Sequence, residues 1–382
     1  MSNQTIKVLI TGDFCPINRI EKLVLESNFN AIINDFARVF QGNDLIITDL
    51  ECPLTESESK RKKIGPHQKA HPVCIELLKQ IGVNLVAMAN NHIMDYGSGA
   101  LSETLELCRL NNIAVVGVGK TPQEAADPFN FSRDGQSVAV FNMADDEFIV
   151  SPDHQFRCNP VNPVSAFYYL KKAREMHDYI IVIVHAGNEF YALPSPRTKK
   201  LYRYLVDMGA DCVISHHTHA FSGYEIYKQK PIFYGLGNFI YDWPEKRNTT
   251  WNKGYIVRLL LGNGVNFELI PLKQGNENPG IFRLNSEETM EFNNEIKRLN
   301  KIIIDDDRLE ADFQKYCETI LPTYDSYIEP YFGKLISALR KRGLFPKLMS
   351  GRKRLLLLNI IRCESHRDVL LRMLSGNTNN ND

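Results

Sequence analysis

The sequence lacks a long apolar run, a recognisable secretory signal and any closely paired cysteines. No stretch of its 382 residues approaches the ~20 apolar residues of a membrane-spanning helix. The start, Met1–Thr5, is polar and has no basic segment followed by an apolar one. The eight cysteines are scattered and form no C-x-x-C pair, which argues against a disulfide framework and a zinc knuckle. These absences predict a soluble cytoplasmic protein with reduced thiols.

An excess of charge of either sign is also absent. The chain has 45 lysines and arginines and 45 aspartates and glutamates, so no general affinity for nucleic acid is expected. Hydrophobic residues make up 43% of the chain and aromatic residues 10%, which is typical of a globular protein with a sizeable core. The length suits one large domain and a smaller one.

Short apolar segments alternate with longer segments of helical spacing as far as Ser215. Such alternation predicts an α/β domain with at least partly parallel sheets. The expected strands are Ile6–Thr11, Leu45–Asp49, Asn84–Ala89, Ile113–Val116, Val138–Met143, Tyr179–His185 and Asp211–Ser215. The expected helices are roughly Arg19–Phe40, Pro72–Ile81, Gly99–Asn111, Pro163–His177 and Arg197–Met208. Three further strands are expected without helices between them, at Pro231–Tyr234, Gly254–Leu261 and Val265–Pro271. We expect these strands to pair in antiparallel fashion and to complete the α/β domain.

The composition changes near Gln274, where the segment Gly-Asn-Glu-Asn-Pro-Gly is typical of a linker. We therefore expect a first domain at residues 1–273, a helical C-terminal region at 285–375 and a disordered tail at 376–382. Helices are expected at Glu287–Ile304 and Arg308–Ile320, and within Tyr331–Arg342 and Lys353–Leu374. The basic and apolar run 352–362 is typical of a packed helix with basic flanks. Peripheral contact with an anionic membrane and docking of a partner protein on these helices stay open.

Three histidines occur within four positions after an apolar strand, in Val213-Ile214-Ser215-His216-His217-Thr218-His219. His217 and His219 are one residue apart, so in an extended segment they share a face, and His216 is expected to point the other way as a structural residue. Imidazole is the commonest protein ligand for transition metals. Taken alone, the run fits a metal site and a solvated loop equally well.

Polar residues also follow several other expected strands. Because ligand sites in α/β sheets lie at the carboxyl ends of the strands, these side chains should converge at one edge. They are Asp13 after the first strand, Glu51 of Asp49-Leu50-Glu51 after the second, Asn90, Asn91 and His92 after the third, and His185 at the end of the sixth. Mixed oxygen and nitrogen ligands suit Mn²⁺, Fe²⁺ or Zn²⁺, and two carboxylates leave room for two ions. We therefore expect a metal site rather than a purely structural polar cluster.

At these positions the sequence resembles the capsule-synthesis CapA family, also called the poly-γ-glutamate synthesis protein family. The resemblance runs from about Ile6 to Asp242. It rests on Gly12-Asp13, Asp49-Leu50-Glu51-x-Pro53-Leu54, Ala89-Asn90-Asn91-His92-x-x-Asp95-Tyr96-Gly97, His185-Ala186-Gly187-x-Glu189, His217-Thr218-His219 and Tyr234-Gly235-Leu236-Gly237-Asn238-Phe239. This family belongs to the calcineurin-like metallophosphoesterase superfamily. The resemblance therefore implies a two-sheet α/β/β/α sandwich that carries two divalent metal ions.

The resemblance also implies roles for individual residues. It gives the first metal Asp13 and His219, the second metal Asn91, His185 and His217, and the bridging position Glu51. His92 would donate a proton or a hydrogen bond to the leaving oxygen, and Asp95 could orient the ring of His92.

Several positions depart from the superfamily pattern or lie outside it. Cys15 stands where an Asp-x-His motif has its histidine, and the bridging residue is Glu51 rather than an aspartate. Glu189 is an added carboxylate that fits a surface acid, a replacement ligand or a general base equally well. Lys69 and His71 fit solvated loop residues better than cations that bind the substrate.

The resemblance implies a metal-dependent hydrolase of the phosphoesterase type in capsule, poly-γ-glutamate or related surface-polymer biosynthesis. Its substrate would be an anionic small molecule, a peptide or a polymer. Two alternatives remain open from the sequence. One is a metal-dependent epimerase that acts on a peptide or amino-acid substrate. The other is a non-catalytic accessory factor of polymer assembly with a degenerate metal site.

Overall fold

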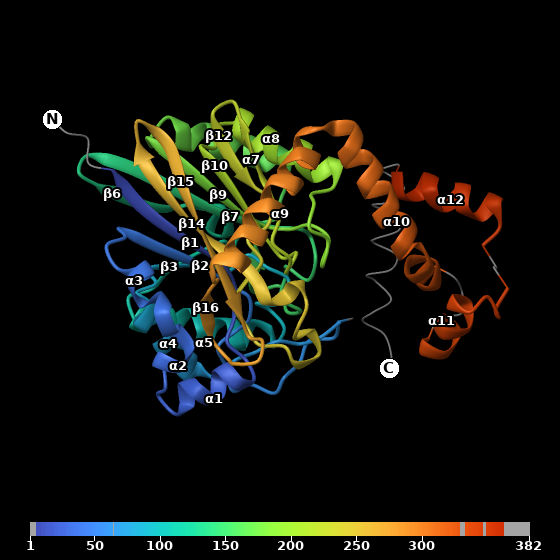
Figure 1. The fold of residues 1–382 in the computed structure, drawn as a ribbon, viewed down its shortest axis with the longest axis horizontal. Coiled ribbons are helices and arrows are strands. Elements are labelled where there is room, and N and C mark those ends of the chain that lie inside the picture. Colours follow the sequence, from blue (N-terminus) through green and yellow to red (C-terminus); the bar gives the residue numbers. More distant parts are fainter. Residues whose placement is uncertain (1–4, 64, 329–332, 347–348, 363–382) are drawn as a thin grey trace. The chain divides into compact units, whose positions relative to one another are not determined.

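The computed structural model describes residues 5–63, 65–328, 333–346 and 349–362. The chain forms two compact units, residues 1–310 and residues 311–382. The first unit contains two large sheets and all of the residues proposed from the sequence for the metal site (Figure 1).

The larger sheet of the first unit has the strand order β16-β15-β14-β1-β2-β3-β4, and β13 pairs with the end of β1. Its strands are β1 (Ile6–Cys15), β2 (Leu45–Leu50), β3 (Leu85–Ala87), β4 (Ala114–Val116), β13 (Asn238–Tyr241), β14 (Lys253–Gly262), β15 (Gly264–Gln274) and β16 (Ile281–Arg283). Strands β1 to β4 are parallel, whereas β14 runs antiparallel to β1 and forms a hairpin with β15. The carboxyl ends of β1, β2 and β3 therefore share one edge.

The second sheet has the order β11-β12-β10-β9-β7-β6. Its strands are β6 (Phe129–Arg133), β7 (Gln136–Ala144), β9 (Tyr179–His185), β10 (Cys212–His216), β11 (Tyr224–Tyr227) and β12 (Lys230–Phe233). Strands β7, β9, β10 and β12 are parallel to one another. A small sheet joins β5 (Val118–Gly119) to β8 (Arg157–Cys158). The ends of β9 and β10 supply the second set of polar side chains.

Alternation of apolar residues along β1 places the sheets in layers. Val8 and Ile10 belong to one buried cluster with residues of the second sheet, whereas Leu9 belongs to another cluster with the helices on the outer face. That outer face is covered by α1 (Arg19–Leu25), α2 (Asn30–Ile33), α3 (Ala37–Phe40), α4 (Ile75–Ile81) and α5 (Gly97–Leu110). On the second sheet lie α7 (Pro163–Arg174) and α8 (Pro196–Asp207), and the short α6 (Pro122–Ala126) packs beside β5. The predicted α/β/β/α sandwich is therefore confirmed.

Two sequence-based expectations about the first unit are wrong. Residues 19–40 do not form one helix, because Ser27 (φ 56°) and Asn34 (φ 47°) adopt left-handed backbone conformations that interrupt it. The expected linker after Gln274 is a tight turn, in which the Gly275 N–H donates to the Gly280 carbonyl at 3.1 Å, and β16 then pairs with β15. The sheet therefore continues beyond residue 273.

Helices follow β16, as the sequence predicts. They are α9 (Ser286–Ile304), α10 (Asp306–Ile328), α11 (Lys334–Lys341) and α12 (Gly351–Arg362). The first, α9, contributes Leu299 and Ile303 to the core of the first unit. None of the helices in the described part of the chain is long and apolar enough to span a membrane. The expected tail at 376–382 lies outside the described residues.

Candidate metal centre

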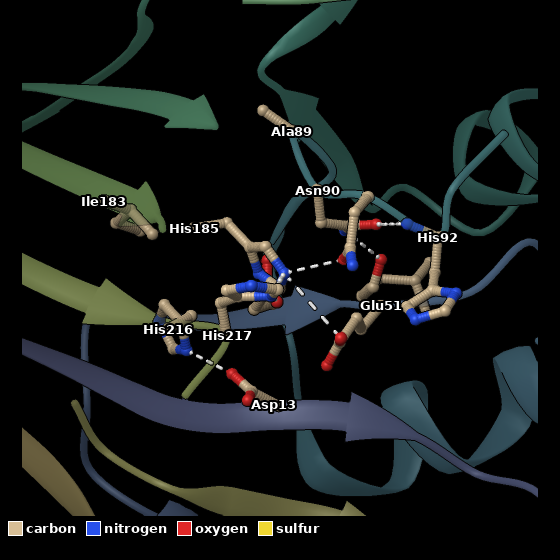
Figure 2. Close-up of polar contacts among 12 residues, drawn as sticks. Asp13, Glu51, Ala89, Asn90, His92, Ile183, His185, His216 and His217 are labelled. Atoms are coloured by element: carbon tan, nitrogen blue, oxygen red, sulfur yellow. Dashed lines mark hydrogen bonds and ion pairs between the residues drawn. The ribbon is translucent and has the colours of Figure 1, made fainter. Parts of the chain in front are cut away.

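The strand ends bring the predicted metal ligands of both sheets together (Figure 2). From the larger sheet come Asp13 near the end of β1, Glu51 directly after β2 and Asn91 in the loop after β3. The second sheet adds His185 at the end of β9 and the loop with His217 and His219 after β10. All six side chains are buried.

Glu51 occupies the middle of this cluster. Its Oε1 lies 3.7 Å from His185 Nε2 and 3.6 Å from His219 Nε2. Both carboxylate oxygens are buried, and neither has a hydrogen-bond partner. Because a buried carboxylate without a partner is costly, this pair of oxygens fits the bridging position between two cations.

Two sets of donor atoms share Glu51. One consists of Glu51, His185 and His217, and the other of Asp13, Glu51 and His219, with all ligand atoms of each set within 4.8 Å of one another. The first set is extended by Asn91, whose Oδ1 lies 3.0 Å from His185 Nε2. Carboxylate, amide and imidazole donors in these numbers fit divalent transition metals. The grouping is the same as the one implied by the family resemblance.

The electrostatics of the cluster also favour a bound cation. Burial raises the pKa of Glu51 well above its usual value, and Asp13 and Asp49 add to this rise. Burial raises the pKa of Asp49 to about 8 and lowers the pKa of His217 to about 3. Burial also lowers the pKa of His185, so both of these imidazoles are neutral, which is the form that binds metals.

Asp49 and His216 are functional candidates that the sequence reasoning did not include among the site residues. Asp49 Oδ2 lies 2.9 Å from His185 Nδ1, which leaves the Nε2 of that ring for the centre. His216 Nδ1 lies 2.8 Å from Asp13 Oδ1, so the expectation that His216 points away is wrong. Burial would raise the pKa of Asp13, but hydrogen bonds with His216 and His219 lower it below its usual value.

His92 lies beside the centre and is held by its neighbours. Its Nδ1 is 2.7 Å from Asp95 Oδ2, as the sequence predicts, which leaves Nε2 as the free ring nitrogen. Asp95 also accepts the Gln68 backbone N–H at 2.8 Å and pairs with the buried ammonium of Lys63. Lys63 was missed because a lysine in a polar loop gives no sequence signal of burial.

A pocket of about 150 Å³ opens next to His92 and His219. It is lined by Pro66, His92, Glu189, Phe190, His219, Tyr241, Trp243, Lys246 and Trp251. Glu189 is exposed at this pocket and does not belong to either group of metal-ligand atoms around Glu51. The aromatic wall, which was not predicted, places Trp251 4.4 Å from His219 between ring centroids.

Three further residues discussed from the sequence lie outside the donor sets. Cys15 is fully buried beside Cys52 and Tyr241, and burial raises the pKa of its thiol. Lys69 Nζ pairs with Glu58 at 2.6 Å, and His71 accepts the Val73 N–H at 3.1 Å. Lys69 and His71 thus make specific local contacts, whereas the sequence favoured solvated loop residues.

A family model described as "Bacterial capsule synthesis protein PGA_cap" matches residues 7–243. The chain belongs to this family. The matched PGA_cap segment contains every metal-ligand candidate, together with His92, Asp95 and Glu189, whereas Lys246 and Trp251 of the pocket follow it. The resemblance seen in the sequence is therefore confirmed.

Two curated relatives carry related names. The chain is 24% identical over 277 residues to the PGA biosynthesis protein CapA of Bacillus subtilis (strain 168), with coverage of 71% of this chain and 72% of that protein. It is 26% identical over 250 residues to the capsule biosynthesis protein CapA of Bacillus anthracis, with coverage of 63% and 61%. The chain thus spans about three fifths of the length of the second relative.

Solved structures that can be aligned with the chain include the calcineurin-like phosphoesterase YfkN from Bacillus subtilis. The TM-score is 0.43 at 13% identity, over 70% of this chain and 90% of that one. A hypothetical protein from Thermus thermophilus also has a TM-score of 0.43, at 16% identity, over 70% of this chain and 99% of that one.

Proposed function

We propose that this PGA_cap chain is a metal-dependent hydrolase of the phosphoesterase type. It acts in the cytoplasm on an anionic small molecule, peptide or polymer in capsule, poly-γ-glutamate or related surface-polymer biosynthesis. The observation that carries the proposal is Glu51, whose two buried oxygens have no partner and lie between the two donor sets. The names of the two Bacillus relatives support the biosynthetic context.

The donor sets fit two divalent ions such as Mn²⁺, Fe²⁺ or Zn²⁺. Asp13 and His219 would hold one ion, Asn91, His185 and His217 the other, and Glu51 both. When bound, such a pair supplies an acidified water and a clamp for phosphoryl oxygens.

The chain's own residues would manage the proton. His92 lines the pocket and has Nε2 free to protonate a leaving oxygen, while Asp95 accepts at Nδ1 and fixes the ring. Burial lowers the pKa of His92, and the carboxylate of Asp95 opposes that fall. The lowered pKa makes the imidazolium a stronger acid but leaves less of it at neutral pH, so general-acid action by His92 would be favoured on the acidic side of neutrality. Lys63 balances the charge of Asp95.

The test is to measure the metal content of the purified protein and its hydrolysis of bis(4-nitrophenyl) phosphate with and without added Mn²⁺. The Glu51→Gln and His217→Ala variants should lose metal affinity by more than about 100-fold, with hydrolysis lost in parallel. His177→Ala is the matched control, because its ring lies outside the centre and bonds to the Ala173 carbonyl in the last turn of α7. If the protein binds no metal and the His217→Ala substitution does not change its hydrolysis rate, the hydrolase proposal is wrong and the protein is the accessory factor instead.

One observation favours a second candidate function, epimerisation of a peptide or amino-acid substrate. His92 and Glu189 are two groups able to transfer protons, and both line the same pocket. An epimerase in D₂O would incorporate deuterium at the α-carbon of its substrate without releasing phosphate. Phosphate release without deuterium incorporation would exclude this alternative.

A further inference from the structure

The pocket beside the metal centre contains one lysine that has no anionic partner. Lys246 is the only lysine or arginine among the residues that line the pocket. Its Nζ lies 3.8 Å from the centroid of the Phe190 ring, and its ammonium makes no hydrogen bond or ion pair with any residue in the described part of the chain. The side chain is half-buried, and its cation–π contact with Phe190 does not neutralise the charge.

Neighbouring cations differ from Lys246 in this respect. Lys63 pairs with Asp95, Arg247 contacts Asp242 at 3.3 Å, and Lys253 contacts Glu291 at 3.8 Å. Their charges are therefore used within the fold. The charge of Lys246 is the one that stays available to a ligand in the pocket.

Phe190, whose ring lies against the Lys246 ammonium, is held in place by the loop that carries His217 and His219. Phe190 has φ 62°, a left-handed conformation that is rare for a bulky side chain, and its N–H donates to the Thr218 carbonyl at 2.8 Å. Its ring lies 6.1 Å from His219 and 6.0 Å from Trp251, between centroids. Phe190 therefore connects the site of Lys246 directly to the metal-binding loop. Strained conformations of this kind persist where the surrounding structure enforces them.

The composition of the pocket indicates what Lys246 meets. Pro66, Phe190 and Trp243 form apolar walls around it. Such walls displace water and strengthen the attraction between an ammonium group and an anion relative to an open surface. They also suit a flat or apolar part of a ligand, since aromatic side chains offer broad faces.

We propose that Lys246 binds a second anionic group of the substrate, which makes the substrate a phosphoester that carries a further carboxylate or phosphate on a flat or apolar body. The inference rests on the proposed function for the position of the reacting phosphate at the metal centre. It goes beyond that function because it specifies the part of the substrate that does not react. The pocket then selects esters by the charge of the leaving portion.

The experiment compares phenyl phosphate with 4-carboxyphenyl phosphate in the Mn²⁺-loaded full chain. The wild type should show a KM about ten-fold lower for the carboxylated ester, as expected for one charge-assisted contact. Lys246→Met should reduce this ratio of KM values to about one, and Lys246→Arg should retain most of it. Because the carboxylate also changes the leaving group, the decisive quantity is the change of the ratio between variants.

Lys171→Met is the matched control, because Lys171 also lies over an aromatic ring, 5.3 Å from the centroid of Phe167, but outside the pocket. It should keep the wild-type ratio. If Lys246→Met keeps that ratio as well, the inference is wrong.

A binding measurement separates this inference from the proposed function. If neither ester is hydrolysed, calorimetry with phenylphosphonate and 4-carboxyphenylphosphonate still tests Lys246, and the hydrolase proposal is decided by the metal analysis and the bis(4-nitrophenyl) phosphate assay. Tighter binding of the carboxylated compound by the wild type, lost in Lys246→Met, supports the inference, and equal binding of both compounds overturns it. Benzene-1,4-diphosphonate in the same series shows whether phosphate or carboxylate is the preferred second anion.

Discussion

Two of the proposed ligand histidines adopt an unusual backbone conformation. His217 has φ 86° and His219 has φ 54°, and neither position is a glycine. Each such residue costs roughly 1–3 kcal/mol unless the surroundings enforce it. Thr218 between them is fixed at both ends, since its Oγ1 donates to the Ala220 carbonyl and its own carbonyl accepts the Phe190 N–H. The loop thus maintains a strained backbone that directs two imidazoles at Glu51.

The stability of the metal-free protein should fall as the pH rises from 6.5 to 8. Burial keeps Asp49 protonated up to a pKa of about 8 and raises the pKa of Glu51, while contacts with Asp13 raise the pKa of His216 and His219 against the opposing effect of burial. In this window the folded state therefore binds more protons than the unfolded state, and stability falls with pH. Burial lowers the pKa of His217 and His185, so these two groups oppose the trend, but only weakly, because unfolded imidazoles are themselves mostly neutral above pH ~7.

Thermal unfolding in the presence of a chelator should show this as a Tm that is lower by a few degrees at pH 8 than at pH 6.5. Saturating Mn²⁺ should reduce or reverse the slope, because metal binding requires deprotonated ligands and so strengthens with pH. A chelated protein whose Tm rises over this interval would contradict the assignment of the buried protons.

The convergence of the proposed ligand residues could be predicted from the sequence because each one lies at or after the end of an apolar strand and belongs to a motif. Asp49 could also have been found, since it precedes Glu51 by two positions and shares its side of an extended segment. His216 could not, because its contact with Asp13 joins strands of different sheets, 203 positions apart. Which face a terminal strand residue presents depends on how the two sheets are stacked.

Among the elements, β1 carries the irregularity that places Asp13. Its pairing with β2 shifts register between Ile10 and Asp13, and β13 pairs with it from Asp13 onward. At the crossing, the Asp13 N–H donates to the Gly237 carbonyl at 3.2 Å. A Cβ on Gly12 would lie 2.0 Å from that carbonyl oxygen, so only glycine permits this approach.

The Gly12→Ala variant should accordingly be destabilised by about 3 kcal/mol or more, because the backbone of β13 must move away. Asp13 would move with it, so the affinity for Mn²⁺ should fall even in protein that still folds. Urea unfolding and metal titration measure the two effects. Gly99→Ala in α5 is the control, since no atom lies within 4 Å of a Cβ there. Equal stability of both variants would show that β1 and β13 separate at little cost.

Long apolar strands were predictable at this scale, and Tyr179–His185 agrees with β9 at both ends. Short strands were predictable in part, since β4 and β12 were expected within one residue of their ends, but β13 was missed. The four-residue strand β13 contains Asn238, whose Oδ1 lies 3.0 Å from His219 Nδ1, and it lies among glycine-rich turns that hide so short an apolar run. The helix expected at 19–40 failed because its apolar spacing survives interruptions by single left-handed residues. Periodicity records which side is buried and not whether the backbone is continuous.

For the whole molecule, the helical character of the C-terminal region was predictable from the sequence, but the attachment of α9 was not. The fully buried Lys199 of α8 donates to the Ile303 carbonyl at the end of α9 and pairs with Asp306 at 2.6 Å. These contacts hold α9 within the first unit, which continues to Glu310. The local sequence around Lys199 does not indicate that its ammonium is buried against the end of α9. The composition change near Gln274 therefore did not mark the end of the first unit, which lies at Glu310.

The balanced total charge conceals a strongly basic segment. Between Pro330 and Cys363 the sequence has no aspartate or glutamate but nine lysines and arginines. Within this segment, α11 places Leu335 on its surface with 72% of the side chain exposed, and Arg340 and Lys341 lie in its last turn. Basic and apolar residues combined in this way are typical of helices that lie on anionic lipid surfaces.

The full chain should therefore bind vesicles of phosphatidylglycerol and phosphatidylcholine, and bind them less well as salt is raised, because surface charges are screened. Each basic residue near the lipid contributes about 1 kcal/mol, so replacing Arg352, Lys353 and Arg354 by glutamine should weaken binding by roughly 100-fold. The same replacement of Lys297, Arg298 and Lys301 on α9 is the matched control and should have little effect. Co-sedimentation measures all three proteins. Equal binding to pure phosphatidylcholine vesicles, or an equal loss of binding in both variants, would contradict this prediction, because neither result depends on the charge of the segment. The segment would then contact a protein partner or pack within the chain.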